Sequence, residues 1–255
     1  MTITDTHTHL YSEAFEEDRE EMIHRALELG VTRFFIPAID STYAPAMFEL
    51  EDKFPEQVFL MTGLHPTHVK ENYKEELAFV EGELKRRRYV AVGEIGIDLY
   101  WDKSTLEIQQ EAFKQQIRLA KQHKLPIVIH CREAFDEIFE VLEAEKGEDL
   151  FGIFHCFTGT LEQAQRVLSF NMKLGIGGVV TFKNGKIDTF LEEVPLKEIV
   201  LETDSPYLAP VPYRGKRNES AYIMKVVEKL AEIYRVPREE VAEVTTGNSK
   251  DIFGV

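Results

Sequence analysis

Apolar and β-branched residues recur along the chain in eight short segments, and stretches with helical spacing separate them. The segments predicted to be strands cover residues 2–10, 31–39, 57–64, 89–97, 126–131, 151–156, 172–179 and 198–203. The stretches predicted to be helices cover residues 14–29, 44–53, 73–87, 105–124, 133–145, 160–169, 185–193, 220–234 and 237–243. The strand segments are apolar on both faces, which is typical of a parallel sheet covered by helices. The alternation therefore predicts an α/β protein.

The number of strand–helix units and the chain length favour one barrel. Eight such units within 255 residues are typical of a (β/α)8 TIM barrel, which usually needs ~250 residues. A doubly wound open sheet is the alternative, but no G-x-G-x-x-G follows the first strand segment. No linker or low-complexity tract interrupts the alternation. We therefore predict a single domain over residues 1–255, with its active site at the carboxyl ends of the strands.

Charge and cysteine content restrict the classes of partner and compartment. The formal net charge of −15 opposes tracking along duplex nucleic acid, although a small cationic pocket for a strand end remains compatible with it. No apolar run is long enough to span a bilayer, and we expect no cleaved leader because candidate ligands begin at His7. Only two cysteines occur, Cys131 and Cys156, so we expect a cytoplasmic protein without a disulfide framework. We infer no obligate protein partner.

Ionisable side chains stand where the predicted strands end. They are, in chain order, His7, His9, His65, Glu94, His130, His155 and Asp204. The carboxyl ends of barrel strands converge on one face, so residues far apart in sequence meet there. A single histidine at such a position is ordinary, but burying many ionisable groups together without a cation is costly. The set therefore predicts a metal site.

Strand alternation also sorts the neighbours of these residues. His7 and His9 lie on one face of the first strand segment, since successive side chains alternate. If His130 and His155 face inward, Cys131 and Cys156 face the helix layer as small buried apolar residues. Glu202 shares a face with Asp204 but lies deeper. It is either a hydrogen-bond acceptor behind a metal ligand or a buried structural carboxylate.

Eight short motifs carry a resemblance to a known family. They are "DTHTHL", "GLHP", "VGEIGID", "HCR", "FHCFTG", "ETDSPYLAP", "RGKRNES" and "GNSKDIF". In order and composition they resemble the TatD family of metal-dependent deoxyribonucleases, within the amidohydrolase-like barrels, and they run along essentially the whole chain. The family usually has N-E-P where this chain has Asn218, Glu219 and Ser220. Ser220 could replace the proline as a helix N-cap.

The resemblance implies a phosphodiesterase site with two divalent metal ions. His7 and His9 would hold the first ion together with Asp204, His130 and His155 would hold the second, and Glu94 would bridge both. Mixed imidazole and carboxylate ligation suits zinc, manganese, nickel or iron better than magnesium, although magnesium is usual in assays of the family. Asp204 would act as the base toward water. His65, which lies near the substrate in related proteins, would protonate the leaving group or contact a phosphate.

Candidate substrate contacts follow the same strand ends. The run "YRGKRN" comes after Asp204, and its polar members Arg214, Lys216, Arg217 and Asn218 are predicted to meet a phosphate. Arg132 follows His130 directly and is a further candidate. Trp101 follows the fourth strand and would either stack a base or pack over a helix.

Three classes of function fit this sequence. The first is a deoxyribonuclease that removes nucleotides from DNA ends. The second is another hydrolase on the same centre, such as an aminoacyl-tRNA deacylase or a small-molecule amidohydrolase. The third is a non-catalytic metalloprotein scaffold. The basic run after Asp204 favours a phosphorylated substrate, and the complete ligand set favours an enzyme over a scaffold.

Overall fold

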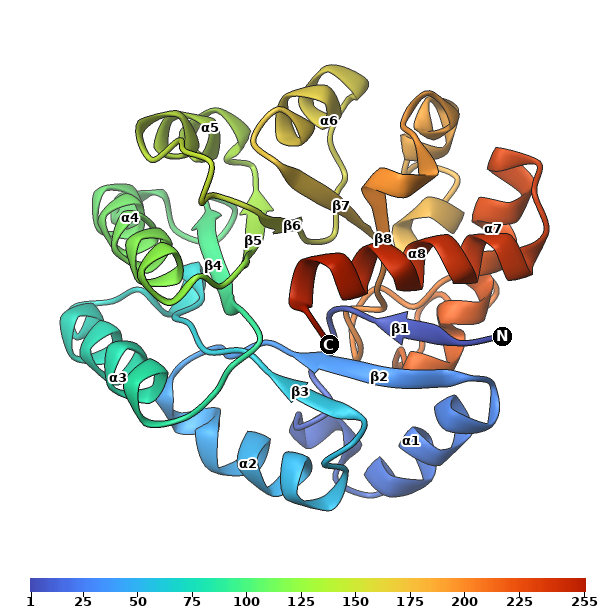
Figure 1. Cartoon of the computed structure of the whole chain (residues 1–255), viewed down its shortest axis with the longest axis horizontal. Helices are drawn as coiled ribbons and strands as arrows, with labels where there is room; N and C mark the ends of the chain where they lie inside the picture. The colour runs from blue at the N-terminus through green and yellow to red at the C-terminus, as the bar shows by residue number, and fades with distance from the viewer.

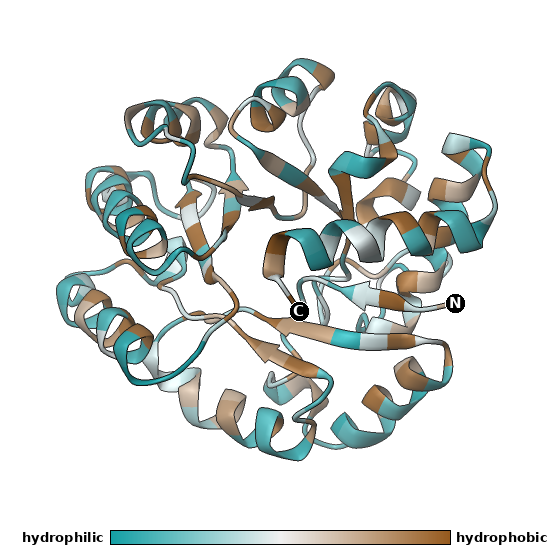
Figure 2. Cartoon of the chain, viewed as in Figure 1, coloured by the Kyte–Doolittle hydropathy of each residue, from teal (hydrophilic) through white to brown (hydrophobic).

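The computed structural model describes residues 1–255 and places eight parallel strands inside a ring of helices (Figure 1). The strands are β1 (Ile3–Asp5), β2 (Val31–Ile36), β3 (Val58–Leu60), β4 (Val92–Asp98), β5 (Ile127–Arg132), β6 (Gly152–Phe154), β7 (Met172–Ile176) and β8 (Ile199–Leu201). The helices are α1 (Arg19–Glu28), α2 (Ala44–Lys53), α3 (Tyr73–Arg86), α4 (Leu106–His123), α5 (Phe135–Ala144), α6 (Leu161–Leu168), α7 (Ile223–Tyr234) and α8 (Arg238–Phe253). The strands are mostly hydrophobic, whereas the helices mix both kinds of residue, as elements buried on one side do (Figure 2).

The strands form two parallel sheets. The first has the order β1-β2-β3, and the second has the order β4-β5-β6-β7-β8. Backbone hydrogen bonds cross both gaps between the sheets: Gly93 N donates to Thr62 O at 2.9 Å, and Thr6 N donates to Leu201 O at 2.9 Å. The arrangement is TIM-barrel-like, as the alternation predicts. Regular strand pairing, however, does not continue around all eight strands.

Three predicted elements differ from the structure. Residues 185–193 form two 3-10 turns instead of a helix, because Lys186 has a φ of 60° and Phe190 a φ of −131°, and neither conformation fits inside an α-helix. The first strand ends at Asp5, so His7 and His9 follow the strand. The last helix continues well beyond the predicted 237–243, as far as Phe253. No helix combines the length and the apolar character needed to cross a membrane.

Apolar side chains fill the bundle at the amino ends of the strands, opposite the predicted ligands. Phe35, Val128, Ile153 and Val200, together with further apolar residues, form a buried cluster with the last residues of α8. The ring of Phe253 stacks on that of Phe35 with 4.0 Å between centroids. Figure 1 shows α8 crossing over the strands, with the C-terminus near the middle of the ring. We call this group the apolar plug; it leaves the carboxyl ends of the strands for the site.

Candidate metal centre

Glu94 lies at the centre of the predicted ligands. Its Oε2 is 3.1 Å from His7 Nε2 and 3.8 Å from His9 Nε2. Its Oε1 is 2.7 Å from His130 Nδ1 and 3.7 Å from His155 Nε2. The two oxygens of one carboxylate therefore face imidazoles from different strand ends. The structure confirms that these residues, which are spread over most of the chain, come together.

A local irregularity of β4 aims Glu94 at this centre. The pairing register between β4 and β5 shifts between Gly93 and Ile95, so Glu94 is left out of the ladder. Such a bulge redirects a side chain that regular pairing would fix. Two residues on, Gly96 has a φ of 141°, and a Cβ there would lie 2.1 Å from His130 O. Glycine is therefore required for β4 and β5 to approach each other at this level.

Asp204 completes the cluster from the loop after β8. Its backbone N–H donates to His7 O at 2.9 Å, and its φ is 55°, so the chain turns sharply at this residue. The Oδ1 atom is 3.5 Å from His9 Nε2 and 3.9 Å from His155 Nε2. Its side chain is 14 % exposed, compared with 2 % for Glu94. Asp204 is therefore the carboxylate of this cluster that faces the opening.

His7 provides a test of whether these residues fit a metal ion. Its ring is fully buried, yet neither Nδ1 nor Nε2 has a hydrogen-bond partner. Buried polar atoms normally have a partner, so an unsatisfied imidazole requires a reason. Ligand atoms ~2.0–2.2 Å from a zinc-sized ion lie ~3 Å or slightly more from one another, and His7 Nε2 is 3.1 Å from Glu94 Oε2. The residues present therefore fit a divalent cation.

The carboxylates of the cluster are held in their charged form. Burial by itself raises the pKa of Glu94, but neighbouring histidines, His65 and His7 first, hold it well below its usual range. Burial likewise raises the pKa of Asp204, but the neighbouring imidazoles of His9, His155 and His7 lower it on balance. Two anionic groups at neutral pH favour a cation between them.

The imidazoles of His130 and His155 are held by further carboxylates. Burial lowers the pKa of His130, but its contacts with Asp98 and Glu94 outweigh burial and raise the pKa to about 9. Burial also lowers the pKa of His155, but Glu202 and Glu94 outweigh it and raise the pKa to about 10. In the metal-free protein both rings are therefore cationic at neutral pH, and a metal ion would displace their protons.

Two carboxylates behind the ligands complete the cluster. Asp98 Oδ2 is 2.9 Å from His130 Nε2, a role that our sequence reasoning missed. Its position four residues after Glu94, at the same strand end, is the signal that could have revealed it. Glu202 Oε1 is 3.1 Å from His155 Nδ1 and accepts from the Cys156 N–H at 2.7 Å. Glu202 thus lies behind the proposed ligand His155 and also accepts a backbone hydrogen bond, so both interpretations of this carboxylate describe part of its surroundings.

One of the two cysteines is not where alternation predicts. Cys131 packs against the core beneath the helices, as expected. Cys156, by contrast, lies beyond the end of β6 with a φ of 45°, and its Sγ falls within 4.8 Å of ligand atoms of His155 and Glu202. Strand alternation fails there because the strand has already ended. Burial and the nearby carboxylates raise the pKa of the Cys156 thiol well above its usual value, so it remains a neutral thiol.

His65 approaches the same centre from the loop after β3. Its Nε2 is 3.3 Å from Glu94 Oε1, whereas its Nδ1 accepts a hydrogen bond from Thr67 N at 3.2 Å. A neutral imidazole that accepts at Nδ1 carries its proton on Nε2. Burial lowers the pKa of His65 to about 4, so the ring is neutral at pH 7. His65 therefore presents an N–H donor to the site.

The predicted substrate contacts divide into two sets, and the four members of the first set are exposed. The guanidinium of Arg132 lies 3.7 Å from the ring centroid of Tyr100, next to Trp101, which is 71 % exposed. Arg214 stacks on Phe182 at 3.8 Å, and Lys216 is exposed. None of Arg132, Arg214 and Lys216 forms an ion pair with a carboxylate of the chain.

The other two candidates are engaged within the protein. Asn218 is fully buried; its side-chain amide donates to the carbonyls of Thr203 and Tyr207, both at 2.7 Å. The prediction that Asn218 contacts substrate is therefore wrong. Arg217 makes two hydrogen bonds to Asp18, both at 2.7 Å, and so ties the loop after β8 to the loop after β1.

Ser220 does not cap a helix. Its hydroxyl donates to Asp5 Oδ2 at 2.7 Å, beneath the metal-ligand loop.

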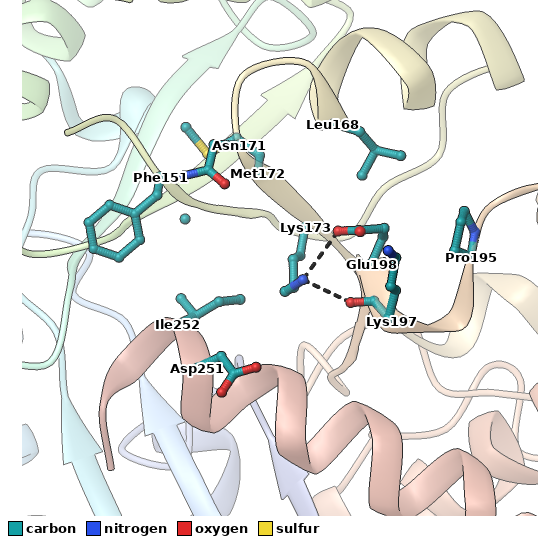
Figure 3. A pocket seen from close by; sticks show the side chains of 11 residues that line it. Phe151, Leu168, Asn171, Met172, Lys173, Pro195, Lys197, Glu198, Asp251 and Ile252 are labelled. Atoms are coloured by element: carbon teal, nitrogen blue, oxygen red, sulfur yellow. Dashed lines mark hydrogen bonds and ion pairs between the residues drawn. The ribbon is translucent and has the colours of Figure 1, made fainter. Parts of the chain in front are cut away.

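A separate hollow lies at the opposite end of the strands (Figure 3). It has a volume of about 570 Å³ and is bounded by the starts of β6 and β7, the turn before β8 and the end of α8. The Lys173 side chain reaches across it to Lys197 O at 2.8 Å and Glu198 Oε2 at 3.2 Å (Figure 3). The ammonium group is thereby satisfied within the protein, and the hollow holds none of the clustered histidines.

Proteins with this fold and a similar sequence are metal-dependent hydrolases. The chain is 39% identical over 252 residues to the metal-dependent hydrolase YabD of Bacillus subtilis, covering 98% of both chains. It superposes on the crystal structure of YjjV, a TatD homologue from Escherichia coli, with a TM-score of 0.93 at 30% identity, covering 99% of this chain and 98% of that one. The phosphotriesterase homology protein of Escherichia coli shares the fold, with a TM-score of 0.72 at 13% identity and coverage of 99% and 98%.

The family can be stated more narrowly. The sequence model described as TatD related DNase matches residues 4–254. The chain therefore belongs to the TatD family of metal-dependent hydrolases.

Proposed function

We propose that this protein is a deoxyribonuclease that hydrolyses phosphodiester bonds at DNA ends with the help of two divalent metal ions. The observation that carries the proposal is the placement of Glu94, whose two oxygens face different groups of imidazoles. A carboxylate in that position can bridge two cations. The TatD related DNase family supports DNA as the substrate, because phosphodiester hydrolysis is the activity that its description names.

The proposed ligands fall into two groups that share Glu94. His7, His9 and Asp204 would hold one ion, and His130 and His155 would hold the other. Two divalent ions held there would polarise a phosphodiester and lower the pKa of a water molecule toward neutrality. Imidazole and carboxylate ligands together favour zinc, manganese, nickel or iron over magnesium.

Two side chains are positioned to handle protons. Asp204 is anionic and faces the opening, so one of its carboxylate oxygens can accept a proton from the attacking water. His65 points Nε2–H into the site and is neutral at pH 7. It therefore serves as a hydrogen-bond donor to a phosphate oxygen, which is the second of the two roles that the sequence left open.

The rim of the site offers cations and an exposed aromatic ring. Arg132 and Arg214 each stack on an aromatic ring and pair with no carboxylate, so their N–H groups are available to a phosphate. Trp101 stands beside Arg132 and is exposed, so an unpaired base can stack on it. These features match a nucleotide strand better than a small neutral amide.

A product analysis tests the proposal directly. Protein loaded with manganese or zinc is incubated with end-labelled single-stranded DNA, duplex DNA, RNA and aminoacyl-tRNA in parallel reactions. We expect mononucleotides released from a DNA end, and no release by Glu94→Gln, which keeps the shape of the side chain but removes the shared carboxylate. Metal content is measured for both proteins. Hydrolysis of aminoacyl-tRNA alone, with intact DNA, would contradict the proposal, as would full DNA hydrolysis by Glu94→Gln.

A further inference from the structure

His9 is the only proposed ligand whose outer nitrogen is bound by a tyrosine. Its Nδ1 lies 2.9 Å from the hydroxyl of Tyr11, and its Nε2 points toward Asp204 and Glu94. Tyr11 is 3 % exposed, so water does not compete for this hydroxyl. The two residues stand two positions apart in the loop after β1. The direction of the hydrogen bond between Tyr11 and His9 decides which nitrogen of His9 carries no proton.

The backbone carbonyl of Pro37 settles that direction. The Tyr11 hydroxyl donates to Pro37 O at 2.9 Å, and no other donor in the structure reaches that carbonyl. Pro37 is buried, so its carbonyl requires a donor. A phenol has a single proton, and Tyr11 uses it here; toward His9 the hydroxyl can only accept. His9 must therefore carry its proton on Nδ1 and leave the Nε2 lone pair free.

The same contact links His9 to the segment that places Glu94. Ala38, the residue after Pro37, donates its N–H to Gly93 O at 3.0 Å and accepts from Glu94 N at 3.2 Å. Pro37 and Glu94 are thereby held in one hydrogen-bonded backbone unit. Tyr11 connects His9 to that unit and so limits movement of His9 relative to Glu94.

We propose that Tyr11 is a positioning residue that locks His9 in the Nδ1–H tautomer and presents a bare Nε2 to a divalent cation. His65 has the opposite arrangement, since the Thr67 N–H donates to its Nδ1 and the proton stands on Nε2. Two histidines of one cluster therefore have opposite tautomers, one suited to ligation and the other to donation. The inference rests on the proposed metal site and does not depend on the substrate being DNA.

Long-range proton–nitrogen NMR correlation on metal-free, ¹⁵N-histidine-labelled protein at pH 8 tests the tautomers. We expect a protonated Nδ1 for His9 and a protonated Nε2 for His65, with the His9 signals identified by their loss in His9→Asn. In Tyr11→Phe the His9 ring should show a mixture of tautomers. The affinity for Zn²⁺, measured by competition with a chromogenic chelator, should fall about 10- to 100-fold, as is typical when such an orienting contact is removed.

Tyr43→Phe is the matched control, because its ring lies 5.5 Å from that of Tyr11 and its hydroxyl makes no hydrogen bond to His9. This variant should keep the tautomer and the Zn²⁺ affinity of the wild type. A wild-type His9 protonated on Nε2 would overturn the inference, even if Tyr11→Phe failed to fold. Wild-type Zn²⁺ affinity in a folded Tyr11→Phe would overturn it as well. A protein that binds Zn²⁺ as expected but leaves DNA intact would contradict only the proposed nuclease activity.

Discussion

The two ends of the strand bundle have opposite chemistry although the same strands build both. In β5, Val128 belongs to the apolar plug and His130, two residues later, contacts Glu94. The same holds for β6: Ile153 belongs to the apolar plug, and His155, just beyond the end of the strand, contacts Glu94. Positions two residues apart lie on one face of a strand, so a single face changes from apolar to ionisable along its length.

The difference follows from what covers each end. The end of α8 closes the plug, whose buried apolar side chains contribute to the stability of the fold. The carboxyl ends remain open to loops, and ionisable groups there are paired with one another at a cost in stability. We therefore expect substitutions in the plug to affect unfolding, and substitutions in the cluster to affect metal binding and catalysis.

The largest expected effect is that of Phe253→Ala in the plug. Removal of a buried aromatic ring typically costs about 3–5 kcal/mol, and Phe253 stacks on Phe35. Urea unfolding should therefore show a much lower free energy, while kcat per folded molecule remains near the wild-type value. If kcat per folded molecule fell along with stability, the plug would also affect catalysis, and the division between the two ends would be wrong.

Asp204→Asn should have the converse effect at the other end. The amide keeps one ligating oxygen but removes the basic group, so kcat should fall ~100-fold or more with little change in KM. Elemental analysis must accompany the kinetics, because metal loss would have the same effect on activity. A fully metallated Asp204→Asn with nearly wild-type turnover would exclude Asp204 as the base.

Metal removal should make stability depend on pH through the cluster. Without metal, His130 and His155 have pKa values raised from 6.5 to about 9 and about 10. The folded state then binds more protons than the unfolded state, so this stabilisation is full below pH 6.5 and is lost as the pH rises toward 9–10. Thermal unfolding of chelator-treated protein should therefore show a falling Tm from pH 7 to 9. The Tm of metal-loaded protein should fall less over the same pH range, because its ligands are already deprotonated. Equal slopes of Tm against pH for the two forms would contradict the ligand assignment.

The smallest expected effect concerns Arg217. Because Asp18 holds its guanidinium at the surface, Arg217→Ala should cost about 1 kcal/mol or less in stability. It should also leave kcat/KM on a nucleotide substrate nearly unchanged. Arg132→Ala, in contrast, should lower kcat/KM about tenfold or more, as expected for the loss of a charge-assisted hydrogen bond. A larger loss of kcat/KM for Arg217→Ala than for Arg132→Ala would show that Arg217, and not Arg132, contacts the substrate.

Much of this protein could be predicted from the sequence, because periodicity is a local property. Apolar segments alternating with helical stretches indicated the parallel strands, and His130 and His155 could be placed at strand ends by counting. The helix predicted over 185–193 is not formed, because the backbone at Lys186 and Phe190 leaves the helical conformation, which the apolar spacing does not reveal. The prediction that Cys156 faces the helix layer was wrong, because side chains alternate regularly only within a strand and β6 ends before this residue.

Tertiary structure alone decided the contacts that join distant segments. The sequence contains Arg217 and Asn218 in a basic run, yet only the fold shows that Asp18 holds one and that buried carbonyls hold the other. The sequence also contains Tyr11, but its role depends on the carbonyl of Pro37, the residue after β2. Hydrogen bonds act over about 3 Å, so which groups come within that distance depends on the packing of the whole chain. The sequence by itself therefore determined which kinds of residue stand in the site. The packing of the whole chain determined their orientation and their protonation.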